Sequence, residues 1–391
     1  MKKLLVCVAL FSGAMAMTAK AQQTVRQQHV ALFVPLYLDS AFDGSSNYRF
    51  GKSFPRQSIT GLEFFEGAQF AMDSLKQEGI KPVYHIFDTR SASGAVSRVG
   101  NSPVFDSIDL IIGAVSGNEY LQVAELAKRK QVPFISATYP NDGGVKGNPQ
   151  VVIVNPKINT HLQNIYNHVL RNYAGNKIIY LRRANTADDR VWEMFRSLDS
   201  SRTGGVIKFQ PQTLPDIFST ADIESRMDSL RQNVVICGSL DENFGRDIAN
   251  ACASLNKAYQ TTLVGMPTWE SIKELNRPEL KMIPVRYSTS FFNPGTDKWT
   301  VDFDANYRKQ SFSKPSDVAY KGFEVTYAFV HLLYKYDRHL NQNLTDKSFK
   351  LLSEYDFRAI RWTPASAEPD YYENKRVNVV RRLNGVLTLL N

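Results

Sequence analysis

The stretch Ile108-Asp-Leu-Ile-Ile-Gly-Ala-Val-Ser-Gly-Asn-Glu119, continued by Pro133-Phe-Ile-Ser136, decides the fold. Residues 108–112 form an apolar run that is interrupted by one Asp and closed by a glycine, as expected of a strand buried on both faces. Apolar residues then recur at helical spacing over Tyr120–Ala127, and three cations follow in the last turn of this helix. The next apolar run begins at once, so the sequence predicts a strand–helix–strand unit of a parallel sheet.

Ser116 lies where this strand ends and the helix begins, which is where open α/β sheets bind ligands. Ser116 and Glu119 also have the spacing of a capping box, in which the serine hydroxyl accepts a hydrogen bond from a first-turn amide and the glutamate reaches back. The capping role is the plainer interpretation. Both roles are compatible, because the remaining free amides of the first turn attract an anion such as a carboxylate.

Residues 1–21 have the charged, apolar and small-residue regions of a secretory signal peptide, and we expect cleavage after Ala21 and release into the periplasm. No later segment has the ~18 uninterrupted apolar residues of a membrane span. Cleavage removes Lys2, Lys3 and Lys20 and no acid, so the formal charge falls from +9 to +6 (9 − 3). This mild excess, without a stripe of Arg and Lys, argues against nucleic acid as a partner.

Cys237 and Cys252 are the cysteines that remain after processing. The first ends a predicted strand, and the second lies well inside the following helix, roughly 15 Å along its axis. That separation is too long for a disulfide. We therefore expect both thiols to be buried and unpaired, with a disulfide as the alternative.

About 370 residues follow the signal peptide, which is more than one hydrophobic core comfortably supports. Alternating apolar strands and amphipathic helices restart after residue 156, and we predict an α/β fold of two doubly wound, Rossmann-like lobes with a central cleft and several hinge crossings. The first lobe is expected to comprise residues 29–156 and 290–366, and the second 157–289 and 367–391. In the second lobe the pattern includes a strand at Val206–Phe209 and a helix at Thr220–Arg231.

Residues 40–58 form a long connection between the first strand and the first helix, and they are rich in Gly, Ser, Asn, Phe and Arg. A connection of this length inside a compact domain is usually functional or mobile. Because it leaves the carboxyl end of a strand, we expect it to overhang the binding edge.

Several short motifs follow one another in a specific order: Phe65-x-Gly67-Ala68-x-x-Ala71-x-Asp73, Phe87-Asp88, Ile111-Ile-Gly113-x-x-Ser116, Val132-Pro133-Phe-Ile-Ser136, Lys314-Pro-Ser316 and Gly322-Phe-Glu324-Val. This order resembles the type I periplasmic binding proteins, the branched-chain amino-acid receptor group of solute-binding proteins, over nearly all of residues 29–391. The sequences Leu62–Gly67 and Met72–Leu75 most resemble binding-protein-like domains that are often linked to LysM modules in envelope proteins of Bacteroidetes. No LysM module is present in this sequence.

The resemblance implies that Ser116, together with Ser136, Ala137 and Thr138, holds the carboxylate and ammonium of an amino-acid ligand. The sequence departs from the family at Ala114, where proline is common. It also departs in the turn Arg182-Arg183-Ala-Asn185, which replaces an acidic turn containing Tyr and Gly.

Tyr37 and Tyr139 lie just past strand ends, where they are placed to stack on a ligand or hydrogen-bond to it. In the second half, Ser239-Leu-Asp-Glu242 repeats the capping-box spacing after a strand, so Ser239 is a second candidate contact, with a plain helix cap as the alternative. Thr268-Trp269-Glu270 follows another strand. We expect Trp269 to form an aromatic wall or the acid to face a ligand ammonium, and the plainer interpretation is a cap beside a half-buried Trp.

Other reactive residues give weaker signals. Arg182 and Arg183 offer bidentate donors for a carboxylate or phosphate, although a solvated pair is the plainer interpretation. His161 and His168 lack a nearby acid or thiolate, and Ser311-Phe-Ser-Lys314 fits a nucleophile pattern without its partner motifs. Phosphate-loop, dinucleotide and nucleophile-elbow motifs are missing. We therefore expect no metal, no cofactor and no enzymatic activity.

These observations favour a periplasmic solute-binding protein of an ABC-type uptake system. It would bind an amino acid or similar small polar ligand between two lobes that close by hinge motion, with a membrane permease or a cell-envelope protein as partner. The alternative is a cell-envelope adaptor or regulator that keeps the fold and recognises peptidoglycan-related material or a protein. A hydrolase built on Ser311 ranks far behind both.

Overall fold

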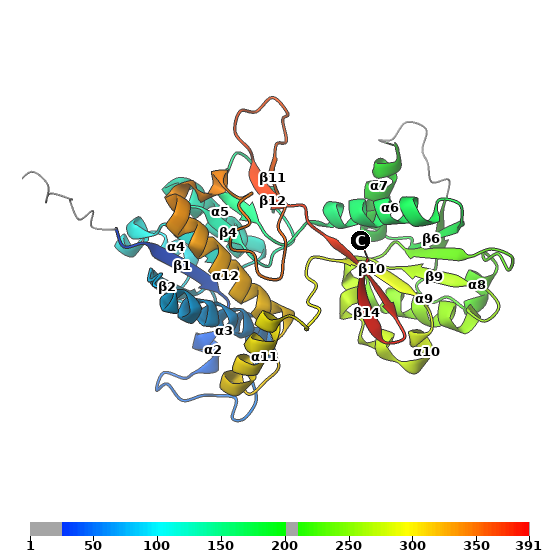
Figure 1. The fold of residues 1–391 in the computed structure, drawn as a ribbon, viewed down its shortest axis with the longest axis horizontal. Helices are drawn as coiled ribbons and strands as arrows, with labels where there is room; N and C mark the ends of the chain where they lie inside the picture. Colours follow the sequence, from blue (N-terminus) through cyan, green and yellow to red (C-terminus); the bar gives the residue numbers. More distant parts are fainter. Residues whose placement is uncertain (1–25, 201–209, 391) are drawn as a thin grey trace, which may run out of the picture.

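Two lobes stand side by side and are joined by three chain segments in the computed structural model, which describes residues 26–200 and 210–390 (Figure 1). The predicted signal peptide and the predicted strand Val206–Phe209 lie outside the described residues. The predicted fold class, an α/β protein with two doubly wound lobes, is confirmed.

The first lobe receives its elements from two stretches of chain. In order, they are β1 (His29–Val34), α2 (Leu38–Ala41), α3 (Arg56–Gln77), β2 (Val83–Asp88), α4 (Val96–Val99), β3 (Leu110–Gly113), α5 (Gly117–Lys130), β4 (Phe134–Ser136), β5 (Val151–Ile153), α11 (Lys298–Ser311), α12 (Asp317–Tyr336), β11 (Phe357–Ile360) and β12 (Tyr371–Asn374). The sheet order is β11-β12-β5-β4-β3-β1-β2. All its pairings are parallel except that of β11 with β12.

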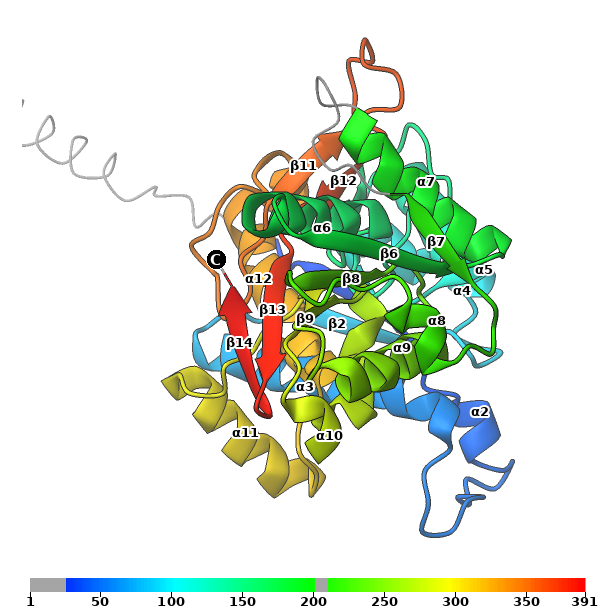
Figure 2. The same ribbon diagram turned by 90° about the vertical axis from the view of Figure 1, so that its right-hand side faces the viewer.

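The second lobe contains most of the middle of the chain and its end. Its elements are α6 (Ile158–Tyr173), β6 (Lys177–Arg183), α7 (Thr186–Ser200), β7 (Pro211–Leu214), α8 (Thr220–Glu224), β8 (Asn233–Cys237), α9 (Glu242–Leu255), β9 (Thr261–Val264), α10 (Pro278–Lys281), β10 (Val285–Thr289), β13 (Asn378–Leu383) and β14 (Val386–Leu390). The sheet order is β14-β13-β10-β9-β8-β6-β7, with the terminal hairpin β13–β14 antiparallel at one edge (Figure 2).

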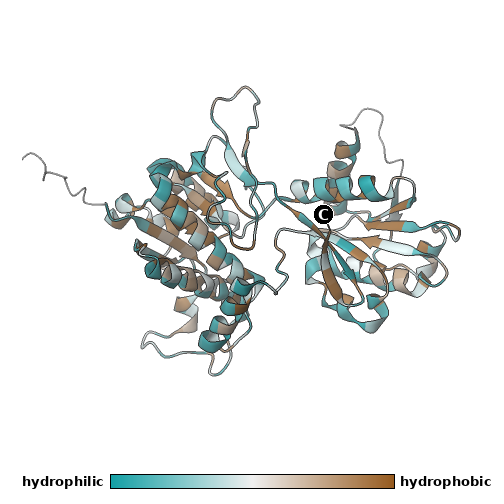
Figure 3. Ribbon diagram, in the orientation of Figure 1, coloured by the Kyte–Doolittle hydropathy of each residue, from teal (hydrophilic) through white to brown (hydrophobic). Residues whose placement is uncertain are grey.

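Strand β1 shows why the first sheet carries helices on both faces. Val30, Leu32 and Val34 contact the apolar cluster of α3 and α12, whereas Ala31 and Phe33 belong to the cluster of α4 and α5. All five side chains are fully buried. An uninterrupted apolar strand therefore fits here, because successive side chains point to opposite faces that are both covered. Figure 3 shows brown, hydrophobic stretches in strands of both sheets.

Helices α3 and α12 touch backbone to backbone through two glycines. A Cβ atom on Gly67 would lie 1.9 Å from the carbonyl oxygen of Ala319, and one on Gly322 would lie 2.2 Å from that of Phe64. No side chain fits at either position without moving a helix. The motif glycines of the sequence are thus required by the close approach of two helices that are far apart in the chain.

The chain passes between the lobes after β5, after β10 and after β12. We expected the last crossing near residue 367. The structure corrects this boundary, because β12 pairs in parallel with β5 of the first sheet. Strands β11 and β12 have four residues each and lie at the edge of the sheet, so their apolar pattern is too short to reveal to which lobe they belong.

Two further expectations about local structure are corrected. Helix α3 begins at Arg56, directly after Pro55, so the last three residues of the predicted connection 40–58 are helical. Helix α8 ends at Glu224 and does not reach Arg231. The Asn233 side chain hydrogen-bonds both the amide and the carbonyl oxygen of Asp228, which folds the following segment into a turn.

Cys237 and Cys252 are buried and free, as predicted. Burial raises the pKa of the Cys237 thiol to about 12, so it is protonated at neutral pH. No helix among the described residues combines the length and apolar character needed to cross a lipid bilayer.

Gly322→Ala is expected to destabilise the chain, because the added methyl group meets backbone atoms of α3. Overpacking of this kind costs about 1–3 kcal/mol, and urea and thermal unfolding should both show a lower midpoint. Gly175→Ala is the matched control, because no atom lies within 4 Å of its added Cβ. Equal midpoints for Gly322→Ala and the wild type would contradict the backbone contact.

Candidate functional site

The carboxyl ends of the parallel strands of both sheets face the inter-lobe space. The chain leaves the first lobe directly after the carboxyl ends of β5 and β12, and it leaves the second lobe after that of β10. All parallel strands of one sheet end on the same edge. The polar residues that follow these strands are therefore brought to two edges that oppose each other across the hinge, which is where open α/β sheets bind ligands.

Ser116 takes the N-cap position of α5, but its side chain makes no capping hydrogen bond. The predicted capping box is therefore wrong. Gly117 has a φ of +55°, which turns the helix start away from the geometry that a capping box needs. Glu119 instead accepts a hydrogen bond from Thr89 and pairs with Arg90 at 2.9 Å. The exposed Ser116 hydroxyl is left available at the amino end of a helix.

Residues 136–139, at the end of β4 in the first lobe, include both buried and accessible residues. Ser136 and Ala137 are fully buried, and the Ser136 hydroxyl has no hydrogen-bond partner among the described residues. Thr138 and Tyr139 are half-buried. Tyr139 packs against Tyr120 with ring centroids 5.0 Å apart. Of the predicted contacts in this segment, only Thr138 and Tyr139 thus expose side-chain surface.

Tyr37 marks a feature that the sequence did not reveal. Asp88 accepts hydrogen bonds from the backbone amides of residues 36, 37 and 38 and so holds the chain after β1 in place. Tyr37 has a left-handed backbone with a φ of +61°. The guanidinium of Arg90 lies 5.4 Å from its ring centroid and adds a cation to the lobe-one edge.

Ser239 in the second lobe differs from Ser116 despite the shared sequence spacing. It is fully buried and donates a hydrogen bond to Asp188 at 2.9 Å. The N-cap of α9 is Asp241, whose carboxylate accepts from the amide of Phe244. The predicted capping box at Ser239 is therefore wrong, because a better cap residue lies two positions later.

Arg182 and Arg183 are occupied by acids of their own lobe. Arg183 contacts Asp188 and Asp241, and it lies over the ring of Phe244 at 5.0 Å. Arg182 pairs with an acid of α7. The expectation of a solvated pair is not met, because both guanidinium groups lie in networks that fix the carboxyl edge of the second sheet.

Trp269 lies in the core of the second lobe with no exposed surface. It follows β9 in the short helix η3 (Pro267–Ser271), and its indole covers Gly265 and Gly245 so closely that a Cβ on either would overlap it. In this position the ring packs against the lobe. Its neighbour Glu270 is exposed and is the residue of this turn that remains accessible.

Glu270 titrates under the influence of both lobes. The residue as a whole is exposed, but neighbouring protein groups desolvate its carboxyl group and raise the pKa to about 7, although a hydrogen bond from Thr289 at 2.9 Å opposes the shift. Asp317, at the start of α12 in the first lobe, raises the pKa further, while Lys321 lowers it. Glu270 is therefore an acid of the second lobe that senses charges of the first.

A groove with a volume of about 510 Å³ opens between the lobes beside the crossings. Amide side chains of α6 line it: Asn159, Gln163, Asn164 and Asn167. Arg358 and Lys375 complete the lining, and each is paired with a neighbouring acid, Asp356 and Glu373 respectively. None of the predicted ligand contacts lies in this groove.

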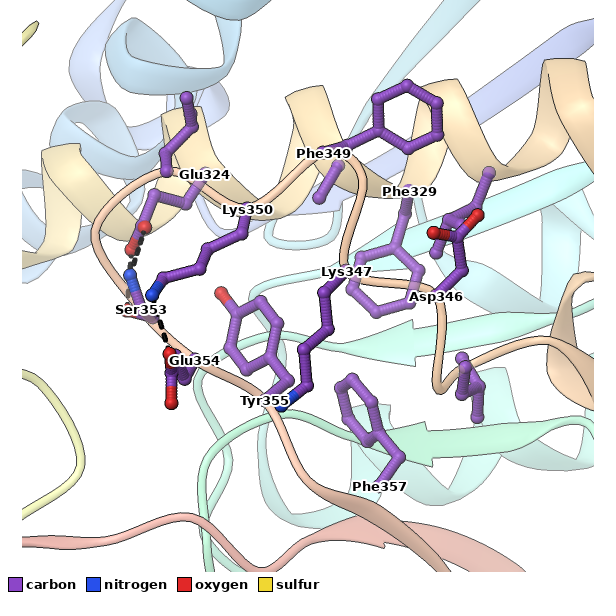
Figure 4. A pocket seen from close by; sticks show the side chains of 14 residues that line it. Glu324, Phe329, Asp346, Lys347, Phe349, Lys350, Ser353, Glu354, Tyr355 and Phe357 are labelled. Carbon is purple, nitrogen blue, oxygen red and sulfur yellow. Dashed lines mark hydrogen bonds and ion pairs between the residues drawn. The ribbon is translucent and has the colours of Figure 1, made fainter.

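Another cavity lies under residues 344–357, which cross α12 as a strap (Figure 4). At one end of the strap, the carboxylate of Glu324 accepts hydrogen bonds from the amides of Leu352 and Ser353, both at 2.7 Å. At the other end, Asp346 accepts a hydrogen bond from Lys335 of α12. The space beneath is only about 30 Å³, enough for roughly one or two water molecules. We interpret this cavity as a packing void.

The described residues contain no group of three His, Cys, Asp or Glu side chains placed to hold a metal ion. His161 is buried and hydrogen-bonds Ser288 through its ring at 2.9 Å, and burial lowers its pKa to about 4. It is thus a neutral core histidine.

No family model matches the sequence, and no curated relative does either. Solved structures of the same fold include an ABC transporter substrate-binding protein from Desulfitobacterium hafniense in complex with Leu, which has 14% identity and a TM-score of 0.59 over 93% of this chain and 100% of that one. A branched-chain amino acid ABC transporter periplasmic ligand-binding protein from Burkholderia xenovorans has 14% identity and a TM-score of 0.61, covering 93% and 95%. A solute-binding protein from Rhodopseudomonas palustris in complex with 3,4-dihydroxybenzoic acid has 16% identity and a TM-score of 0.52, covering 92% and 95%. The architecture is that of two-lobed periplasmic binding proteins.

The raised pKa of Glu270 predicts a pH-dependent stability. The folded chain holds this proton more tightly than the unfolded chain, whose glutamates titrate near 4.5. Its contribution to stability is therefore complete below about pH 4.5 and is lost as the pH rises through 7. Glu270→Gln should remove this loss, so its thermal midpoint relative to the wild type should rise between pH 5 and pH 8. Glu368→Gln, at an exposed glutamate, is the control. If the curves of Glu270→Gln and wild type stay parallel, the carboxyl is not perturbed.

Proposed function

We propose that this chain is a non-enzymatic, periplasmic solute-binding protein of an ABC-type uptake system. It takes an amino acid or a similarly compact polar carboxylate between its lobes. The observation that carries the proposal is the opposition of two strand edges across a three-segment hinge, one with an available serine at a helix start and the other with an accessible acid.

The lobe-one edge supplies groups that suit a carboxylate. The free first-turn amides of α5 and the uncommitted hydroxyl of Ser116 both donate hydrogen bonds to an anion, and the helix dipole favours the same charge. Thr138 and Tyr139 extend this edge after the next strand. Arg90 adds a cation beside Tyr37, although Glu119 already neutralises much of its charge.

The lobe-two edge supplies a group that suits an ammonium. Glu270 is accessible and is poised near neutral pH, so a ligand cation lowers its pKa and makes it fully ionised. Arg182 and Arg183 at this edge are paired with acids of their own lobe, so we assign the ligand carboxylate to the first lobe. A zwitterion thereby bridges the two edges.

Ligand binding at both edges stabilises the closed form, because a hinge rotation brings the edges together only when a ligand fills the space between them. Solved structures of this fold hold Leu and 3,4-dihydroxybenzoic acid, which are both compact carboxylates. The similarity supports the class of ligand, and a membrane permease is the partner that such a function requires.

The second candidate function is that of a cell-envelope adaptor that keeps the fold and recognises a protein or peptidoglycan-related material. One observation favours it. Trp269 is buried in the core and Ser239 donates its hydrogen bond to Asp188. The second lobe therefore exposes fewer ligand-binding groups than the sequence predicts. The sequence Leu62–Gly67, which resembles LysM-linked envelope proteins of Bacteroidetes, also favours the adaptor function.

A thermal-shift screen with the twenty amino acids and a set of aromatic carboxylates tests the first function. A ligand present at 100 times its dissociation constant stabilises the folded state by about 2.7 kcal/mol, which gives a clear rise in the unfolding midpoint. A flat screen with a cooperatively folded protein would favour the adaptor function.

Ser116→Ala is expected to weaken binding of a ligand found in that screen by about tenfold or more, because a hydrogen bond to a carboxylate is lost. Isothermal titration measures the change. Ser229→Ala, at an exposed serine just before the amino end of β8 and so opposite the carboxyl edge, should bind as the wild type does. Unchanged affinity in Ser116→Ala would remove this serine from the site.

A further inference from the structure

The segment between α2 and α3 folds into a small structure of its own, which we call the aromatic tip (residues 42–54). Phe42 and Tyr48 form an isolated antiparallel bridge. The Asp43 carboxylate accepts from the amides of Ser45 and Asn47, at 2.9 and 2.8 Å. The Tyr48 hydroxyl donates to the carbonyl oxygen of residue 53 at 2.6 Å. The predicted long connection is thus an ordered element. It protrudes from the first lobe next to α2 (Figures 1 and 2).

Four aromatic rings make up the aromatic tip. Tyr48 lies at the centre, with its ring centroid 5.5 Å from that of Phe42, 5.9 Å from that of Phe50 and 6.1 Å from that of Phe54. The three phenylalanines nevertheless stay 39%, 40% and 64% exposed. None of the four belongs to a buried core cluster of either lobe. The rings pack on each other and present the rest of their surface to solvent, which marks an interaction site.

Three cations and two acids surround the rings. Arg49, Lys52 and Arg56 are all exposed. The two acids accept hydrogen bonds from backbone amides: Asp43 from those of the tip, and Asp39 from that of Ala92 at 2.8 Å. The surface of the tip is therefore aromatic with a small excess of positive charge, and it complements a partner that is anionic and apolar.

We propose that the aromatic tip binds the surface of an anionic lipid membrane. Aromatic side chains insert at the boundary between headgroups and acyl chains, and Arg and Lys beside them pair with anionic headgroups. The tip comprises 13 residues (42–54), fewer than the roughly 20–30 residues per side of a standard protein interface. A fluid lipid surface receives such a small cluster without a matching pocket, whereas a protein partner needs one.

The charge of the whole chain supports this partner. The formal charge from Gln22 onward is +6, which draws the protein towards an anionic surface before the aromatic rings insert. The four rings of the tip are not among the residues proposed to contact the solute at either strand edge. The proposal is therefore independent of whether the chain binds a solute.

Vesicle flotation tests the proposal with the chain that begins at Gln22, so that the predicted signal peptide cannot contribute. Vesicles with 30% phosphatidylglycerol in phosphatidylethanolamine should carry the protein, and pure phosphatidylcholine vesicles should not. The double variant Phe50→Ser/Phe54→Ser and the single variant Lys52→Glu should each lower the partition coefficient about tenfold or more. Thermal unfolding confirms that both variants fold, since these side chains lie outside the lobe cores.

The controls are Phe312→Ser, at a phenylalanine that is 93% exposed elsewhere in the first lobe, and Lys257→Glu, at an exposed lysine of the second lobe. Both should bind anionic vesicles as the wild type does. The proposal is overturned if the wild type does not float, or if the tip variants and the controls lose binding equally. It is also overturned if only vesicles that retain native envelope proteins capture the chain, because the tip then serves a protein partner.

Discussion

The backbone contact between α3 and α12 is the constraint on which the two-lobe arrangement depends. Helix α12 follows nearly the whole second lobe in the sequence, yet Gly322 and Gly67 bring it against a helix of the first. The chain must therefore return, and the insertion of β12 beside β5 makes it cross once more. Three connections between the two lobes therefore form the hinge across which the strand edges face each other.

The first and third crossings are held together by one buried acid. The carboxylate of Glu373, at the end of β12, has no exposed surface and accepts from the hydroxyl of Thr160 at 2.8 Å, and Lys375 pairs with it at 2.8 Å. Because Thr160 belongs to the first turn of α6, the acid ties a strand of one lobe to a helix of the other. A buried carboxylate is tolerated only with such partners, which makes this junction specific in geometry. The second crossing, after β10, lies next to Glu270 and its partner Thr289.

The architecture could be predicted from the sequence, whereas the chemistry of the two edges could not. Strands such as β1 and β3 are buried on both faces, and their uninterrupted apolar runs signal this locally. The spacing Ser-x-x-Glu occurs at both Ser116 and Ser239, but only Ser116 is an N-cap, because α9 begins after Asp241. The contacts of each hydroxyl depend on residues that are distant in sequence. Ser239 donates a hydrogen bond to Asp188. Thr89 and Arg90 contact Glu119, which was expected to form a capping box with Ser116. The burial of Trp269 likewise depends on two glycines that accommodate its ring.

The two strand edges differ in which charged groups remain available to the proposed ligand. Arg182 and Arg183 at the lobe-two edge are paired with acids of their own lobe, whereas Glu270 remains accessible. Desolvation raises the pKa of the Glu270 carboxyl group, and Asp317 of the first lobe raises it further. Glu270 and Asp317 repel each other when both are ionised, whereas Lys321 and Arg382 attract Glu270. In the proposed receptor, a ligand ammonium near Glu270 is attracted to this acid, and a neutral group of equal size is not.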